Sequence, residues 1–85
     1  MGFEIVWDPK ALKDLEKLPR EFASRIIAKI DDAGTNPKRY AEQLVGISGY
    51  KIRAGDYRIF VGISYNPNKL KVMAIKHRRE AYKKK

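Results

Sequence analysis

The stretch from residue 50 to residue 63 constrains the fold most, because apolar and polar side chains alternate on either side of a Gly-Asp pair at positions 55 and 56. Such a pair is typical of the two-residue loop of a β-hairpin, and the length of the loop sets the register of the strands. The predicted register places Arg53 opposite Arg58. One face of the hairpin then receives residues of the core type, which are Tyr50, Ile52, Ile59, Val61 and Ile63.

The other face of the predicted hairpin is cationic and receives Lys51, Arg53 and Arg58 around Phe60. Facing arginines repel each other, so stability alone does not explain them. Basic residues on a sheet often form only a solvated face. Residues 1–48 contain eight basic residues (Lys or Arg) and eight acidic residues (Asp or Glu). Residues 49–85 contain eleven basic and two acidic residues, so the net charge of +9 lies in this second part. This imbalance favours a phosphate-binding face, on which Phe60 would either pack or stack on a nucleobase.

The remaining pattern predicts one α+β domain that spans residues 1–85. A β-prone segment at residues 3–7 leads into a helix that begins at Asp8, and a second helix runs from Pro19 to Gly34. The apolar stripes of the helices comprise Ala11, Leu12, Leu15 and Leu18, and Phe22, Ala23, Ile26, Ile27, Ile30 and Ala33. Period-two alternation predicts antiparallel strands near residues 47–54, 57–65 and 69–77. We therefore expect an N-terminal strand and a helical hairpin packed on a small antiparallel sheet.

The composition argues against several other kinds of protein and site. The chain has no Cys and one His, which speaks against disulfides, a thiolate metal site and a structural zinc. Its longest apolar run, residues 59–63, is far shorter than the roughly 20 residues of a membrane-spanning helix. The N-terminus does not resemble a signal peptide. We expect a cytoplasmic protein with no membrane contact, no metal and no cofactor.

The last predicted strand adds basic residues to the cationic face. If residues 66–69 form a four-residue loop, His77 lies beside Arg58, and Arg78 follows directly. A shift of one residue would turn His77 to the other face, because side chains alternate along a strand.

Two segments give the chain a family resemblance. Residues 50–60, YKIRAGDYRIF, and residues 77–82, HRREAY, resemble the RelE/ParE superfamily of toxin–antitoxin toxins, closest to its RelE branch. The resemblance covers nearly the whole chain, and it implies a RelE-like fold and a ribosome-dependent endoribonuclease that cuts mRNA in the decoding site. In that family the ribose 2′-hydroxyl attacks the adjacent phosphate. The sequence holds no metal-ligand cluster, so we expect cleavage without a metal.

The same resemblance implies roles for individual residues. Lys51, Arg53 and Arg58 match the catalytic basic cluster of the hairpin. Arg78 matches the arginine that follows the last strand, and Tyr82 resembles the C-terminal tyrosine of the family.

The residues themselves support part of this chemistry. Arg58 and a second arginine can present planar donors to two phosphate oxygens. Lys51 is the preferred base, because neighbouring cations disfavour a charged ammonium group, and a simple phosphate contact is equally open. His77 would protonate the leaving oxygen or lie at the strand end without a role. Tyr82 would stack on a base or pin the tail to the sheet.

Two other functions would also fit the sequence, and the family resemblance implies one partner. A DNA-gyrase inhibitor of the ParE type would share the fold without needing the basic cluster. A noncatalytic nucleic-acid-binding module would use the same cations only to contact phosphates. A toxin of this kind should be held inactive by an antitoxin with an acidic, partly disordered helix that folds on the basic sheet, and any contact with operator DNA would run through that antitoxin.

Overall fold

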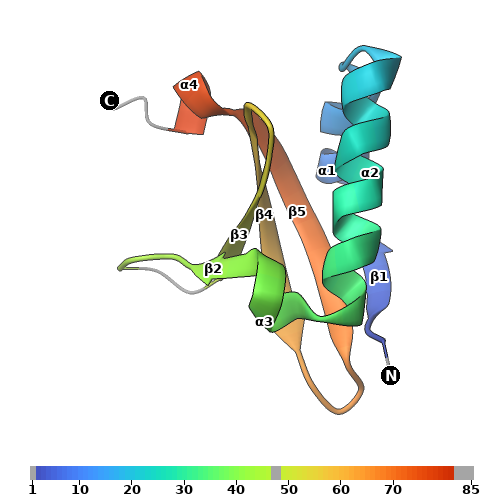
Figure 1. Cartoon of the computed structure of the whole chain (residues 1–85), viewed down its shortest axis with the longest axis vertical. Coiled ribbons are helices and arrows are strands. Elements are labelled where there is room, and N and C mark those ends of the chain that lie inside the picture. Colours follow the sequence, from blue (N-terminus) through green and yellow to red (C-terminus); the bar gives the residue numbers. More distant parts are fainter. Residues whose placement is uncertain (1, 47–48, 82–85) are drawn as a thin grey trace.

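The computed structural model describes residues 2–46 and 49–81. Its elements are β1 (Glu4–Trp7), α1 (Pro9–Glu16), α2 (Arg20–Thr35), α3 (Pro37–Tyr40), β2 (Ala41–Gln43), β3 (Tyr50–Ala54), β4 (Tyr57–Ser64), β5 (Lys69–His77) and α4 (Arg78–Ala81). The strands form one mixed sheet in the order β1-β5-β4-β3-β2, and α1 and α2 lie on one of its faces (Figure 1). The predicted α+β class is confirmed. No helix in the described part is long and apolar enough to cross a membrane.

The N-terminal strand belongs to the sheet instead of packing on it. β1 runs parallel to β5, from Glu4 opposite Lys69 to Trp7 opposite Val72. The predicted antiparallel arrangement is therefore confirmed for β3, β4 and β5 and wrong at this edge. A strand of four residues carries no sign of the direction of its partner, which is set by how the intervening helices return the chain to the sheet.

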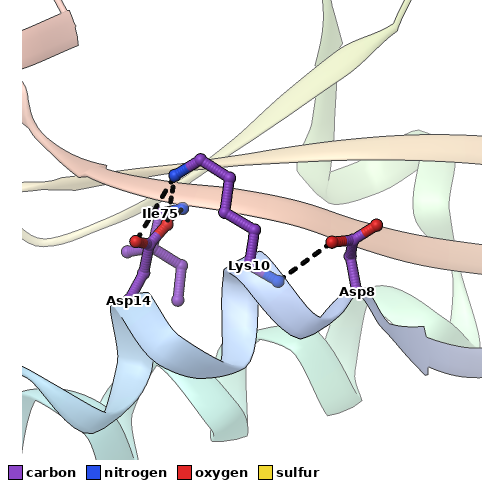
Figure 2. A network of polar contacts seen from close by, with 4 residues as sticks. All are labelled: Asp8, Lys10, Asp14 and Ile75. Atoms are coloured by element: carbon purple, nitrogen blue, oxygen red, sulfur yellow. Dashed lines mark hydrogen bonds and ion pairs between the residues drawn. The ribbon is translucent and has the colours of Figure 1, made fainter.

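Helix α1 begins where its sequence predicts. The side chain of Asp8 accepts a hydrogen bond from the backbone N–H of Lys10 at 3.0 Å, and Pro9 occupies the first helical position (Figure 2). The cap satisfies a donor that has no partner within the helix, and proline loses nothing at a position whose N–H is unused.

A second carboxylate fastens α1 to the sheet. The backbone N–H of Ile75 in β5 donates to Oδ2 of Asp14 at 3.0 Å, and Nζ of Lys10 lies 3.4 Å from the same oxygen (Figure 2). The pairing of β1 with β5 ends at Val72, so β1 does not reach the backbone N–H of Ile75, and Asp14 accepts its hydrogen bond instead. This hydrogen bond fixes the distance between the helical layer and β5, the strand that carries the last basic residues.

The core lies between α2 and the sheet. Ile26 of α2 is 1% exposed, and Ile52 of β3 and Ile59 of β4 are fully buried. The predicted core face of the hairpin is thus confirmed. The predicted stripes are wrong at Leu12 and Ile27, which are 42% and 41% exposed because they lie at the margins of their helical faces.

The hairpin of β3 and β4 has the predicted register, with Arg53 opposite Arg58 and Ala54 opposite Tyr57. Gly55 has a φ of 61°, a left-handed conformation that glycine adopts without a steric penalty. The two-residue loop is therefore the feature that places the two arginines side by side.

Two short elements ahead of the hairpin were not predicted. α3 is a single helical turn, and β2 pairs with β3, with Glu42 opposite Lys51. Neither is long enough to show a hydrophobic period, which is why the sequence pattern misses both. β2 thus adds a carboxylate, that of Glu42, at the edge of the basic hairpin.

Candidate nucleic-acid interface

The face of the sheet turned away from α1 and α2, here called the open face, carries the predicted cations. Figure 1 shows the two longer helices on one side of the sheet and α4 on the other. Since Ile52 and Ile59 point into the core, their neighbours Lys51, Arg53 and Arg58 point to the open face. The structure therefore brings these three predicted residues together.

Strand β5 places Lys76, and not His77, beside Arg58. Lys76 is opposite Arg58, whereas His77 is opposite Tyr57, so the predicted position of His77 is wrong. The His77 ring lies edge-on to that of Tyr57, with centroids 5.3 Å apart. Its Nδ1 accepts a hydrogen bond from the backbone N–H of Arg79 at 3.2 Å. The cation of β5 that lies beside Arg58 is thus Lys76.

The connection between β4 and β5 explains this difference. Ser64 pairs with Lys69, so the loop comprises residues 65–68 instead of 66–69. The earlier loop shifts the pairing of β4 with β5 by two residues from the predicted register. A β-bulge at Met73 then reverses this shift by one residue. The remaining shift of one residue exchanges the two faces of β5. The period-two pattern of the sequence does not reveal a bulge. It does show that a one-residue shift would replace His77 by Lys76 beside Arg58.

Lys51, Arg53, Arg58 and Lys76 form what we call the cationic cluster. Arg58 lies at its centre, between Arg53 on β3 and Lys76 on β5. Arg58 is only 7% exposed, whereas the side chain of Arg53 is 55% exposed. A guanidinium that is already held by its surroundings loses little rotamer freedom when it binds a ligand, and the cations beside it favour an anion there.

Glu42 of β2 is the carboxylate of this surface that the sequence pattern does not reveal. Its Oε1 lies 3.6 Å from Nη2 of Arg53 and 3.9 Å from Nζ of Lys51. The Glu42 side chain is 54% exposed, so these ion pairs contribute little to stability and can exchange for a bound anion. Glu42 therefore places a proton acceptor directly beside Lys51 and Arg53.

Arg78 lies at the end of the cationic cluster that faces the hairpin loop. Its backbone N–H donates to the carbonyl of Asp56 at 2.6 Å, and its Nη1 lies 4.0 Å from Oδ1 of the same residue. These contacts attach the start of α4 to the loop between Arg53 and Arg58. The predicted Tyr82 lies outside the described residues.

The chemistry that this surface can perform is that of phosphate binding. The arginines offer planar donors in pairs, and the lysines offer point charges beside them. Within residues 2–46 and 49–81, no group of His, Asp or Glu side chains has an arrangement that could hold a metal ion. The cationic cluster is thus the feature of the described chain that can neutralise an anionic transition state.

Solved structures of toxin–antitoxin proteins have the same fold. The RelBE2 toxin–antitoxin complex of Mycobacterium tuberculosis matches with a TM-score of 0.83 and 20% identity, covering 91% of this chain and 99% of that chain. The RelE–RelB complex of Pyrococcus horikoshii gives a TM-score of 0.75 at 21% identity, covering 92% and 97%. The intact RelBE complex of Escherichia coli also gives 0.75 at 21%, covering 88% and 95%. At these identities the likeness establishes a RelE-like toxin fold.

The sequence establishes the family. Residues 5–82 match the model of the ParE toxins of type II toxin–antitoxin systems, so the chain belongs to this family. Together with the fold, this confirms the predicted membership of the RelE/ParE superfamily. No curated protein sequence matches the chain.

Proposed function

We propose that this toxin is a ribosome-dependent endoribonuclease that inhibits translation by cutting mRNA in the decoding site. The observation that carries the proposal is the buried Arg58 between Arg53 and Lys76 on the open face. Keeping three cations adjacent costs stability, and this cost is understandable if they neutralise a phosphate. A protein that acts only by binding another protein has no need of that arrangement.

The cationic cluster binds the scissile phosphate in this proposal. Arg58 and Arg53 present planar donors to its two nonbridging oxygens, and Lys76 supplies charge from the other side. As the 2′-hydroxyl attacks, negative charge grows on the phosphate, and fixed cations stabilise it without having to rearrange. The cluster supplies the charge that a metal ion would otherwise bring, so we propose a metal-independent reaction.

Glu42 is the better candidate for the base. A carboxylate side chain accepts a proton directly, without first having to lose one of its own. We therefore propose that Glu42 accepts the proton and that Lys51, whose Nζ lies 3.9 Å from Oε1 of Glu42, contacts the phosphate. This replaces the preference for Lys51 that the sequence alone suggested.

The residues at the end of β5 position the substrate and the leaving group. Arg78 approaches the phosphate from the hairpin loop, to which Asp56 attaches it. His77 lies on the helix side of β5, so we propose that it holds the first turn of α4 through Arg79 instead of protonating the leaving oxygen. The family resemblance keeps Tyr82 as the residue that stacks on a nucleotide.

The ribosome completes the site. The open face binds phosphates wherever they occur, and nothing in the cationic cluster bends an RNA strand into the in-line geometry that 2′-hydroxyl attack requires. Positioning of this kind is worth several kcal/mol. We propose that mRNA held in the decoding site supplies the geometry, so free RNA is cut slowly.

An antitoxin encoded with this chain is the expected partner. The solved structures that share this fold include RelBE-type complexes of a toxin with its antitoxin. We propose a cognate antitoxin whose acidic, partly disordered helix folds over the open face, because a chain with a net charge of +9 attracts an acidic segment. Contact with operator DNA would be made through that antitoxin.

Inhibition of DNA gyrase is the second candidate function. The match to the ParE family model favours it, and it would leave the cationic cluster without a catalytic role. A noncatalytic RNA-binding module would retain the phosphate contacts but release no new RNA ends.

Primer extension on an mRNA translated in a cell-free system tests the proposal. The toxin is added with ribosomes and, separately, to the same mRNA without them, and supercoiling by purified gyrase is measured in parallel. The proposal expects discrete cuts that require ribosomes, 5′-hydroxyl ends on the downstream fragments and unaffected gyrase. Intact mRNA combined with inhibited supercoiling would establish the second candidate instead.

A further inference from the structure

A hollow of about 410 Å³ lies beside the cationic cluster, at the edge of β4. It is lined by Gln43, Gly49, Tyr50, Gly62, Ile63 and Met73. The mechanism proposed above uses none of these residues.

The hollow exists because β3 is shorter than β4. β3 starts at Tyr50, opposite Val61, while β4 continues to Ser64. Gly49, with a φ of 118°, turns the chain away, and its carbonyl accepts a hydrogen bond from the N–H of Leu44 at 3.0 Å. Among the described residues, the end of β4 therefore has a strand neighbour on one side, which is β5.

Gly62 and Met73 form an apolar floor in the hollow. Gly62 lies on the same side of β4 as Arg58 and Phe60, because residues two apart share a face. A Cβ added at Gly62 would lie 3.6 Å from Sδ of Met73, the bulged residue of β5, which is 44% exposed. The glycine thus leaves the thioether accessible, and a polarisable sulfur packs well against an aromatic ring.

The wall of the hollow carries an amide. Gln43 is the last residue of β2 and is exposed. Its register opposite Tyr50 places it on the helix side of the sheet, from which it lines the hollow across from Gly62 and Met73. A side-chain amide offers a donor and an acceptor together, which is the pattern that recognises the polar edge of a nucleobase. An apolar floor with one such amide suits a planar heterocycle.

Positive charge lies on both sides of the hollow. Arg58 is four residues from Gly62 along β4, about 13 Å by the rise of a β-strand, and Lys71 is opposite Gly62 on β5. The Lys71 side chain is 55% exposed and lies 3.8 Å from Asp8, a surface ion pair that a phosphate can replace. A short RNA strand with one phosphate on the cationic cluster can therefore bring a neighbouring base to the hollow.

We propose that this hollow binds a nucleobase of single-stranded RNA adjacent to the scissile phosphate, and that Gln43 discriminates between bases there. The inference rests on the proposed function, because it takes the cationic cluster as the phosphate site. It adds a base-binding site, so that cleavage depends on sequence at one position next to the cut.

Nuclear magnetic resonance titration of the full chain tests the inference without requiring cleavage. The probe is a trinucleotide with 2′-O-methyl riboses, which cannot be cut by 2′-hydroxyl attack, and its matched control lacks the central base. The inference expects the intact probe to shift the amide signals of Gly62 and Met73, and the abasic probe to shift only those of the cationic cluster. Identical shifts with both probes would overturn the base site and leave the phosphate site standing, whereas no shifts with either would overturn both.

Two variants make the test specific. Gly62→Val fills the floor at a site where a Cβ meets only Met73, and we expect it to weaken binding of the intact probe about tenfold, as expected for the loss of a stacked base. Its affinity for the abasic probe should not change. Gln43→Ala should reduce the difference between probes that carry different central bases. Val45→Ala, at a position that is 98% exposed, should change neither, and equal binding of the intact probe by Gly62→Val and wild type would refute the site.

Discussion

Burial separates Arg58 from the other arginines of the chain that are described. It is 7% exposed at the centre of the open face, so its guanidinium is held before any ligand arrives. Lysine at this position would keep the charge but lose the planar pair of donors that fits two phosphate oxygens.

Arg58→Lys should therefore cleave mRNA on ribosomes about 10²-fold more slowly, the cost of removing one oriented donor from a site that stabilises developing charge. Single-turnover cleavage measures this, with circular dichroism to show that the variant is folded. A rate within a factor of about two of wild type would mean that charge alone is used at this position.

Glu42 is the residue that the structure adds to the candidate site. Glu42→Gln removes the proposed proton acceptor and keeps the size of the side chain, so we expect the single-turnover rate to fall by at least about 10²-fold. RNA affinity should hold or rise, because a negative charge next to Lys51 and Arg53 is lost. Glu16→Gln, on the exposed surface of α1, is the matched control. An unchanged rate would return the role of base to Lys51.

The cluster was predictable only where register was predictable. Arg53 and Arg58 face each other because a two-residue loop leaves no freedom in the pairing of β3 with β4. The fourth cation could not be assigned, because the loop after Ser64 and the bulge at Met73 together decide whether Lys76 or His77 reaches the open face. Glu42 lies on a strand too short to show any period.

At the scale of elements, the contact of α1 with β5 holds the end of β5 that carries Lys76 in place from the helical side of the sheet. Asp14 accepts the N–H of Ile75, one residue before Lys76, so the hydrogen bond fixes the part of β5 that carries the fourth cation. The helices themselves were predictable from Asp8-Pro9 and from apolar stripes. The hydrogen bond between Asp14 and Ile75 could not be predicted from the sequence, because it joins residues 61 positions apart in the chain.

Asp14→Ala should lower the free energy of unfolding by about 1–3 kcal/mol, because it leaves a partly buried N–H without its acceptor. Urea denaturation followed by circular dichroism measures the loss. Lys10→Ala removes only the exposed ion pair to the same carboxylate and should cost less than about 1 kcal/mol. Equal losses for the two variants would show that the ion pair, and not the Ile75 hydrogen bond, holds α1 in place.

At the scale of the whole molecule, the division of charge follows the division of the fold. The helical layer comes from the part of the chain in which acids balance bases, and the open face comes from the part that carries the net charge of +9. Composition predicted this polarity, and the sheet converts it into one cationic surface. What composition could not predict is which cations converge.

The salt dependence of RNA affinity distinguishes the cations of the cationic cluster from other exposed cations of the protein. For single-stranded RNA, the plot of log affinity against log salt falls with a slope of about −0.7 for each phosphate neutralised. Lys76→Ala should make this slope shallower by about 0.7, whereas Lys38→Ala, an exposed change on α3, should leave it unchanged. Fluorescence anisotropy with a labelled, 2′-O-methyl oligonucleotide measures both, and equal effects would indicate binding by net charge alone.

The central claim is that the open face of the sheet carries out the toxic reaction, and a matched pair of arginine variants tests it most directly. Arg58→Ala and Arg39→Ala remove the same side chain and the same charge, one from the cationic cluster and one from the exposed surface of α3. Each is added to an mRNA translated in a cell-free system, and the cuts are quantified by primer extension. The account predicts that Arg58→Ala reduces cleavage at least about 10²-fold while Arg39→Ala stays close to wild type. Undiminished cutting by a folded Arg58→Ala protein, or equal losses in the two variants, would contradict it.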